Sequence, residues 1–366
     1  MNILKTGSAP DKVFKRSVLA PLREAGALDE NLGTENVIFS SASGIIRAGV
    51  SVSACVNRAA NELFAYGVRP EAFSVSILVP EGTVEDELSR IAFLAGEAGA
   101  SLKMKCCCAS AEISDMVKSP FMSVTCFGRR EGADAGETTA RGNADAGQKP
   151  GDFRGLKIIM AGTAAVETTA LLGELFFDEL SERFSKSFLS DLDEFKDRFS
   201  IGGIMETARG TAVCADEVSA GVGESAACAE GISAGVGESA GCAVIDAIPV
   251  GSGGVFDSLR RFGERHACGL NADIKKIPIR QITVELCELH DINPYNSASL
   301  GAVLLAAEDE KEILKRLRGK GIPAEVIGCF TRGNDMTVTN GELKRHLESP
   351  GRDDINKIKS SRIHRE

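Results

Sequence analysis

The sequence predicts an α+β protein with two domains. The chain has 366 residues, and one domain commonly takes about 100–200 residues. Residues 37–127 read as strand, helix, strand, helix, strand, strand, an order typical of ferredoxin-like domains. Residues 131–150 lose all apolar periodicity, so we expect a linker there. The predicted organisation is an N-terminal domain at 1–130, a C-terminal α/β domain at 151–340 and a charged, frayed tail at 341–366.

In the N-terminal half, apolar residues recur at helical spacing in three segments, and β-forming residues gather in four. The helix that follows Thr83 has Glu85, Asp86 and Glu87 in its first turn, where the helix dipole favours acids. The expected elements are a helix at 11–25, a strand at 37–40, a helix at 52–66, a strand at 72–79, a helix at 83–99, and strands at 101–107 and 121–127.

In the C-terminal half, one strand is followed by four helical segments and then by a strand, a helix and a strand. The segment from Glu308 to Arg318 has acids first and bases last, which matches the helix dipole. The expected elements are a strand at 156–161, helices at 165–183, 188–199, 255–266 and 281–290, a strand at 303–306, a helix at 308–318 and a strand at 324–327.

The charge of the chain opposes nucleic-acid binding. Lys and Arg number 42 and Asp and Glu 52, so the net charge is −10, whereas a phosphate backbone requires a basic face. There is no Trp and only two Tyr, so stacking platforms for bases are scarce. No apolar run is long enough to cross a membrane, and the N-terminus lacks the apolar core of a signal peptide. We therefore expect a cytoplasmic protein without nucleic-acid or membrane partners.

The eleven cysteines include no CxxC pair, so the common structural zinc pattern is absent. Most of them lie in apolar stretches, where a free thiol acts as a small hydrophobic group. Cys106–Cys108 fall in an expected strand, and the favoured interpretation is a strand core of small side chains. The alternative is a reactive or redox thiol.

An internal repeat interrupts the second half. The string Ser-Ala-Gly-Val-Gly-Glu-Ser-Ala occurs at 219–226 and again at 233–240, and Cys214, Cys228 and Cys242 follow the same spacing of 14. The glycines oppose a continuous helix, and a spacing of 14 is not a metal-ligand spacing. We interpret residues 214–243 as a repeat insertion in a surface loop.

The common motifs GxxxxGK[ST], GxSxG and HExxH are absent from the sequence. Several short segments, taken in their order along the chain, instead resemble the aminoimidazole ribonucleotide (AIR) synthetase superfamily. Lys149–Asp152, followed by a strand and Ala164–Leu172, is similar to the opening of the family's second domain. Ile277–Arg280 and Ser299–Leu305 resemble its Pro-x-Arg and Ser-x-Gly-x-Leu-Leu series, and Asn61–Pro70 resembles its Asn-Asp…Gly-x-x-Pro segment. The most similar subgroup is that of the hydrogenase expression/formation proteins.

The resemblance implies an AIR synthase-like fold of two domains and a site for ATP and Mg²⁺. Glu62 matches the acid that helps to hold the metal–phosphate complex, and Glu112 matches the acid of a Thr-Glu loop. The cofactor-binding residues implied are Asn61, Glu62, Glu112, Glu167, Thr169, Gly253 and Gly254, with Glu62 and Glu112 as metal ligands.

The sequence departs from the family pattern at several acidic positions. The family's first-strand Asp falls on Ala42, and its Asp-x-Thr-Glu-Gly-Gly loop falls on Pro249–Gly254, which retains only the two glycines. The segment 26–30 keeps acids but lacks the family's glycines, and no Cys follows Cys329. Mg²⁺ requires oxygen ligands, so these losses predict weak ATP binding.

Three functional hypotheses follow. The first is an enzyme that uses ATP to activate an amide or acyl oxygen, as in hydrogenase maturation, with a small molecule or a protein as substrate. The second is a binding or regulatory protein in which the nucleotide chemistry has decayed, and the third is a thiol-based metal or redox module. The strands at 72–79 and 121–127 have apolar residues on both faces, so we also expect a homodimer through the N-terminal sheet.

Overall fold

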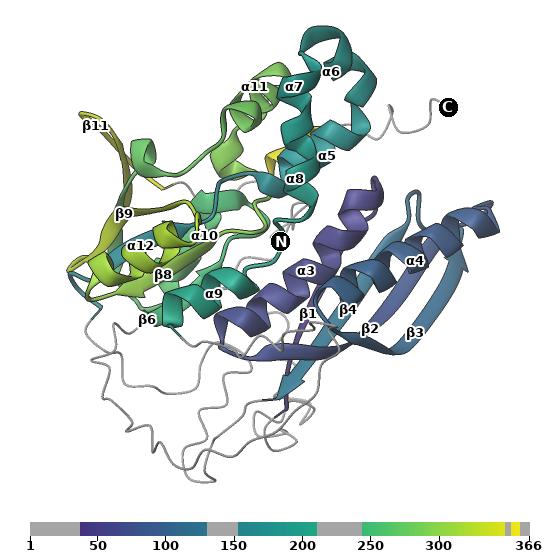
Figure 1. Ribbon diagram of the computed structural model, residues 1–366, viewed down its shortest axis with the longest axis horizontal. Helices are drawn as coiled ribbons and strands as arrows, with labels where there is room; N and C mark the ends of the chain where they lie inside the picture. The colour runs from purple at the N-terminus through teal and green to yellow at the C-terminus, as the bar shows by residue number, and fades with distance from the viewer. Residues whose placement is uncertain (1–36, 130–152, 211–243, 348–352, 359–366) are drawn as a thin grey trace, which may run out of the picture.

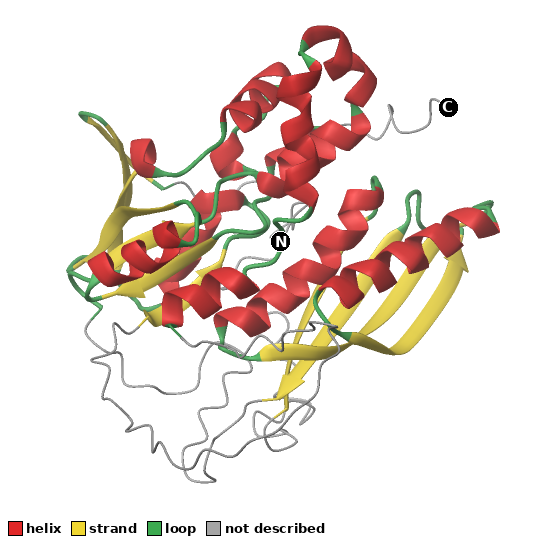
Figure 2. Ribbon diagram, in the orientation of Figure 1, coloured by secondary structure: helices red, strands yellow, loops and turns green. Residues whose placement is uncertain are grey.

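The computed structural model describes residues 37–129, 153–210, 244–347 and 353–358. Two β-sheets, each covered by helices, make up these residues (Figures 1 and 2). The predicted mixed α/β fold with two sheets is therefore confirmed. Four sequence-based predictions lie outside the described residues: the helix at 11–25, the linker at 131–150, the string Lys149–Asp152 and the insertion at 214–243.

The first sheet has four strands in the order β1-β4-β2-β3. β4 pairs antiparallel with β1 and β2, and β2 pairs parallel with β3 across the helix α4. This order of strands and helices is the one expected from the sequence. The elements are β1 (Val37–Ile45), α3 (Gly49–Ala65), β2 (Arg69–Pro80), α4 (Glu85–Ser101), β3 (Lys105–Ser114) and β4 (Phe121–Arg129).

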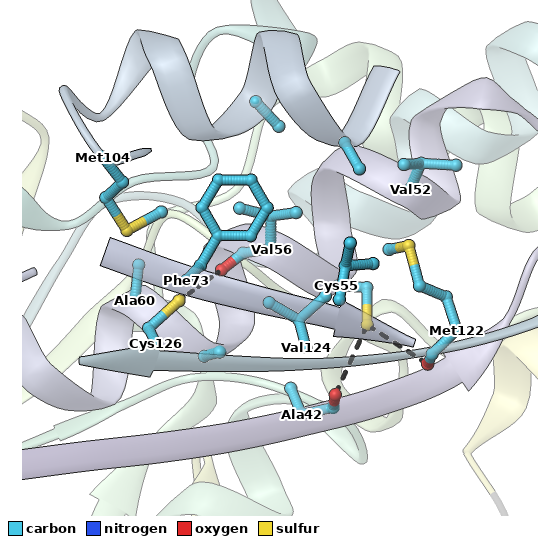
Figure 3. Packing of buried hydrophobic residues seen from close by; sticks show 14 of the residues in the cluster. Ala42, Val52, Cys55, Val56, Ala60, Phe73, Met104, Met122, Val124 and Cys126 are labelled. Atoms are coloured by element: carbon cyan, nitrogen blue, oxygen red, sulfur yellow. Dashed lines mark hydrogen bonds between the residues drawn. The ribbon is translucent and has the colours of Figure 1, made fainter. Parts of the chain in front are cut away.

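One face of this sheet packs against α3 and α4, and Figure 3 shows part of the resulting core. The Cys55 thiol donates to the carbonyl oxygens of Ala42 and Met122 at 3.6 Å, and the Cys126 thiol donates to that of Val56 at 3.9 Å. Burial raises the pKa of Cys55 to about 11 and that of Cys126 to about 12. These two cysteines are un-ionised core groups, as the sequence predicted.

The opposite face of the sheet is partly exposed and carries hydroxyl groups at its centre. Ser41 on β1 pairs with Thr125 on β4, and their hydroxyl oxygens lie 2.7 Å apart. Apolar side chains lie at the two ends of this face, with Phe39 opposite Phe127 and Ile45 opposite Phe121. This face therefore has polar side chains at its centre and apolar ones at its ends. The sequence predicts apolar residues on both faces of β2 and β4, and the structure shows that the second face is only partly apolar.

Cys106–Cys108 are exposed, so the interpretation of these residues as a strand core is wrong. They lie on β3, which is an edge strand with a neighbour on one side only. A register shift between Phe73 and Ser74 of β2 places Cys106 opposite Phe73 and Cys108 opposite Ser74. Such an irregularity interrupts the alternation on which a sequence-based burial assignment depends.

The second sheet has seven strands in the order β11-β10-β7-β9-β5-β8-β6. Among these pairs β7 and β10 run parallel, and the others are antiparallel. The strands are β5 (Lys157–Ala161), β6 (Val244–Pro249), β7 (Gly269–Asp273), β8 (Val303–Ala307), β9 (Ala324–Thr331), β10 (Met336–Asn340) and β11 (Leu343–His346).

Helices cover both faces of the second sheet, which makes it a sandwich. Because side chains alternate along a strand, Ile158 and Met160 of β5 face α10 (Gly254–Arg265), and Ile159 and Ala161 face the other side. That other side is covered by α9 (Gly202–Arg209) and α12 (Glu310–Gly319).

A third group of helices packs beside the second sheet and against the start of α3. The helix expected at 165–183 is divided into α5 and α6, and the one expected at 188–199 consists of short turns. The elements are α5 (Val166–Leu175), α6 (Phe177–Arg183), α7 (Lys186–Leu189), α8 (Asp193–Lys196) and α11 (Gln281–Leu289), with a 3-10 turn at Ser190–Leu192. Two further 3-10 turns, Ile274–Lys276 and Pro294–Asn296, pack with the second sheet and α10.

Part of the expected charged tail is ordered, contrary to the expectation that it frays from residue 341. β11 pairs with β10, and a 3-10 turn at Asp354–Lys357 follows. Ile355 of this turn is buried in the same apolar cluster as α5 and α11. Two isolated apolar residues among polar ones, Ile355 and Ile358, give no periodic signal, which explains why the sequence did not predict this contact.

None of the described helices is both long and apolar enough to span a bilayer.

Candidate functional site

The helix α3 lies between the two sheets (Figure 1) and carries two of the candidate residues, Asn61 and Glu62. Its one side packs on β1, β2 and β4, and the other side contacts α5, α9 and β6. At its N-terminus, the backbone N–H groups of Gly49 and Val50 donate to the Glu174 carboxylate of α5 at 2.9 and 2.8 Å. α3 is thereby fixed to the second half of the chain.

Asn61 is buried and uses its amide to hold the chain before α9. Its Nδ2 donates to the carbonyl oxygen of Phe199 at 2.8 Å, and its Oδ1 accepts from the Ile201 N–H at 3.0 Å. The sequence predicted Asn61 as a cofactor-binding residue. In this structure the side chain joins the two halves of the molecule.

Glu62, the next residue, faces the C-terminal half of α10. Its Oε1 lies 3.8 Å from Nη2 of Arg261. One turn further along α10, Arg265 and His266 both contact the buried Asp246 carboxylate, at 3.3 and 2.8 Å. Burial raises the pKa of Asp246, but the His266 hydrogen bond and the Arg265 charge together hold it below its usual value. Glu62 therefore lies at the edge of a cluster of paired charges.

Glu167 lies in the first turn of α5 and forms a buried ion pair with Arg58 of α3. Arg58 Nη2 donates to both carboxylate oxygens, at 2.7 and 2.9 Å, and Glu167 is 8% exposed. Burial lowers the pKa of Arg58, but the Glu167 charge outweighs this and keeps that pKa above its ordinary value. Because Arg58 neutralises it, Glu167 is engaged before any cation arrives.

Sequence reasoning missed Arg58, although one signal pointed to it. It is a single charged residue within Val52–Ala60, an otherwise small and apolar helical segment. A charge on a buried helix face requires a partner, but the sequence alone does not identify which acid it is.

Thr169 is fully buried between α5 and α11. Its hydroxyl donates to the Ala165 carbonyl at 2.8 Å and lies 2.9 Å from the Thr283 hydroxyl. The sequence predicted this residue as cofactor-binding, whereas here its hydroxyl is used within the helix packing.

Gly253 and Gly254 form the turn that begins α10, with φ of +77° and +67°. A Cβ at Gly254 would lie 2.5 Å from the Tyr295 carbonyl oxygen, so glycine is required there. The Gly254 N–H donates to the Gly251 carbonyl within the turn, whereas the Gly253 N–H points out of it at the positive end of a 12-residue helix, an arrangement that suits an anion.

The Asp353 carboxylate already occupies this position. Its Oδ2 accepts from the Gly253 N–H at 2.9 Å, and its Oδ1 accepts from the N–H groups of Ala298 at 3.3 Å and Ile355 at 3.0 Å. Burial raises the pKa of Asp353 to about 6, in spite of these three hydrogen bonds. The Asp353 charge also raises the pKa of Arg58, after the larger effect of its ion-pair partner Glu167.

Glu112 lies apart from all these residues. It is exposed on β3 opposite Leu78 of β2. The residues on either side of Leu78, Ile77 and Val79, belong to the core against α3. Because side chains alternate along a strand, Glu112 lies on the face of the sheet away from α3. Within one copy of the chain the structure therefore does not bring Glu62 and Glu112 together. Among the described residues, no three His, Cys, Asp or Glu side chains converge to hold a metal ion. A protein-only Mg²⁺ site does not fit these residues.

Comparisons with known proteins agree with this architecture. Residues 249–340 match the family model of the AIR synthase related protein, C-terminal domain. No curated protein sequence matches the chain. The resemblance predicted from the sequence is confirmed for this C-terminal region, and the solved structures below confirm it for the fold.

Three solved structures share the fold at low identity. The hydrogenase maturation protein HypE of E. coli has a TM-score of 0.62 at 15% identity, covering 96% of this chain and 93% of that one. HypE in complex with ATP has a TM-score of 0.60 at 14% identity, covering 98% and 97%. Thiamine monophosphate kinase from Aquifex aeolicus has a TM-score of 0.58 at 12% identity, covering 89% and 97%.

Proposed function

We propose that this AIR synthase-related chain binds ATP weakly, where α3, α5 and the start of α10 meet, and that phosphoryl transfer from it is slow. The observation that carries the proposal is the Gly253–Gly254 turn, which holds the Asp353 carboxylate, a group that interacts electrostatically with Arg58. A backbone N–H, a helix dipole and a guanidinium are groups that bind phosphate. The ATP complex of the structurally similar HypE adds support.

The role of each group follows from its chemistry. The Gly253 N–H would donate to a phosphate oxygen, since it donates to a carboxylate oxygen now. Arg58 would supply positive charge, and Asn61 would hold α3 against the chain before α9, which keeps Arg58 in place. Glu62 is the predicted ligand best placed to take part, because its contact with Arg261 is long, at 3.8 Å.

The weakness of the binding follows from the carboxylates. Ala42, Pro249 and Ser252 stand where the family resemblance places acids, and Arg58 engages Glu167. Mg²⁺ takes one or two carboxylates together with phosphate oxygens, so loss of these acids weakens the metal-nucleotide complex. Each lost charge-assisted contact costs about 1.5–3 kcal/mol, or about ten- to a hundredfold in affinity.

A second candidate function is ATP-dependent activation of an amide or acyl oxygen on a small molecule or protein. Retention of Glu62 beside Arg261 favours it, because a carboxylate and a guanidinium are groups that support phosphoryl transfer.

We infer that the chain forms a homodimer through the uncovered face of the first sheet. Phe39, Phe127, Ile45 and Phe121 frame that face, and burial of such a surface favours association. Glu112 lies on the same face, so a second copy is the means by which it would reach a nucleotide. We also propose a cytoplasmic location, because eight described cysteines, exposed ones included, are free thiols.

Calorimetric titration with Mg-ATP and a steady-state ATPase assay test the proposal. We expect a Kd above about 100 μM and turnover far below about 1 per second, the low end for enzymes. Glu62→Ala should weaken binding further, whereas Glu325→Gln, which removes an exposed paired acid, should not. Micromolar affinity with turnover near 1 per second, lost in Glu62→Ala, would instead support the second candidate. Absence of any heat in the wild type would contradict both.

A further inference from the structure

The strand β11 forms the outer edge of the second sheet, and β10 is its only strand neighbour among the described residues (Figure 1). At the end of this pair, the Leu347 N–H donates to the Met336 carbonyl oxygen at 2.9 Å. Because hydrogen-bonded and non-hydrogen-bonded pairs alternate along an antiparallel ladder, Arg345 also bonds to β10, whereas the residues on either side of it do not. The backbone N–H and C=O groups of Lys344 and His346 therefore point toward the open edge.

Basic side chains gather along this edge. Lys344, Arg345 and His346 lie on β11, and Lys275 and Lys276 lie on the 3-10 turn that contacts β10; all five residues are exposed. None of the ion pairs between described residues includes any of them. The whole chain has a net charge of −10, so this edge differs in sign from the molecule that carries it.

Arg345 is held in place by an aromatic contact. Its guanidinium carbon lies 5.5 Å from the centre of the Phe256 ring, and that ring stacks on Tyr295 with 5.6 Å between the ring centroids. Side chains alternate along a strand, so Lys344 and His346 project from the other face of the sheet. The edge therefore presents basic groups on both faces, beside open backbone donors and acceptors.

The chemistry of this edge selects an acidic, extended peptide. Lysine on an edge strand opposes pairing with a neutral or basic strand, and the same charge favours an acidic strand placed opposite it. A second copy of β11 carries the same charges, so the pairing of two copies through this edge is opposed. A nucleic acid would neutralise the cations, but it would not complete a β-ladder, and the net negative charge of the chain repels its phosphates.

We infer that β11 is a docking edge, at which an acidic, extended segment of a partner protein adds as a further strand of the second sheet. The backbone of that segment pairs with the open N–H and C=O groups of Lys344 and His346. Its acidic side chains, at alternate positions, face the side chains of the same two residues. The inference goes beyond the proposed function and does not depend on ATP.

Fluorescence anisotropy of a labelled peptide in which Glu and Val alternate tests the inference on the full chain. We expect saturable binding, because such a peptide favours an extended conformation and places its acids on one face. A peptide of the same charge in which Pro replaces Val cannot complete a ladder, and it should bind at least about tenfold more weakly. Equal binding of the two peptides, or no binding of the first, would overturn the inference.

Charge-reversed variants test the role of the basic side chains. Lys275→Glu combined with Lys344→Glu should weaken binding of the Glu-Val peptide at least about tenfold, because two attractive contacts become repulsive. Lys311→Glu combined with Lys315→Glu is the matched control, since it makes the same change of net charge at two exposed lysines of α12. The control should change the Kd by less than about twofold. Equal weakening in both variants, or tighter binding of a single-stranded oligonucleotide than of the peptide by the wild type, would reject an acidic peptide as the partner.

Hydrogen exchange on the wild type gives a measurement that needs no variant. Saturating Glu-Val peptide should slow exchange at Lys344 and His346 at least about tenfold, because their N–H groups become bonded. The Leu347 N–H, which is already bonded to β10, should change less. Unchanged exchange at Lys344 and His346 would contradict strand addition, even if the charge-reversed variant failed to fold.

Discussion

The ion pair between Arg58 and Glu167 links the two halves of the molecule, and its removal should be costly. Side-chain exposures are 23% for Arg58 and 10% for Glu167, so both charges are largely withdrawn from water. Removing one member of a buried pair leaves the other charge uncompensated, at a cost of about 3–5 kcal/mol. Because Arg58 keeps some exposure, we expect about 3 kcal/mol for Glu167→Gln.

The assay is urea denaturation followed by far-UV circular dichroism, because the chain has no Trp for fluorescence. Glu325→Gln is the matched control, since Glu325 pairs with Arg318 at 2.6 Å and both side chains are about half exposed, at 51% and 52%. An exposed pair contributes about 0–1 kcal/mol, so the control should change the free energy of unfolding by less than about 1 kcal/mol.

A double-mutant cycle completes the test. Glu167→Met combined with Arg58→Met should be more stable than the sum of the single changes by about 2 kcal/mol or more, because no lone charge remains. If the two changes add without coupling, or if Glu167→Gln costs no more than Glu325→Gln, the account of a buried, mutually neutralised pair is wrong.

Three further predictions concern Asp353, the cysteines and the glycine turn. Since burial raises the pKa of Asp353 to about 6 from an unfolded value near 3.9, its contribution to stability is lost as the pH rises from about 4 to 6. Relative to Asp353→Asn, wild type should lose about 2 kcal/mol over that window in urea titrations, and parallel pH profiles would refute the assignment. Iodoacetamide should label Cys106–Cys108 in the native protein and leave Cys55 unmodified, as read by peptide mass spectrometry; labelling of Cys55 at the same rate would contradict its burial. Gly254→Ala should lower the free energy of unfolding by at least about 2 kcal/mol, since the added Cβ meets a carbonyl oxygen in addition to the strain of a left-handed backbone. Gly82→Ala, which has the same kind of backbone but open space around it, should lower it by about 1–2 kcal/mol in the same urea titrations. Equal losses would contradict the close approach at Gly254.

The sequence predicted the elements whose patterns are long and periodic. α12 has acids at its start and bases at its end, and α4 has three acids in its first turn, so both were located from local signals. β6 and β7 were missed because polar residues and end residues Pro249 and Gly269 interrupt their short apolar runs, whereas the equally short β5 and β8 are almost wholly apolar. α9 begins with two glycines, which have low helix propensity, and its stability depends on packing against the second sheet.

The candidate site was less predictable than the fold, because its contacts join residues that are far apart in the sequence. Arg58 and Glu167 are 109 residues apart, and Gly253 and Asp353 are 100 apart. The family resemblance identified Glu167 and Gly253 as single positions. It did not indicate that one is neutralised by an arginine and that the other already binds a carboxylate. Such partners follow from tertiary structure and have no local sequence pattern.

Hydrogen exchange in the presence of saturating ATP tests the central claim, that nucleotide binds where α3, α5 and α10 meet. Binding there should change exchange of the amides in the turn at Gly253 and Gly254 and in the first turns of α3 and α5. Changes confined to other elements, with none at the turn, would contradict the account.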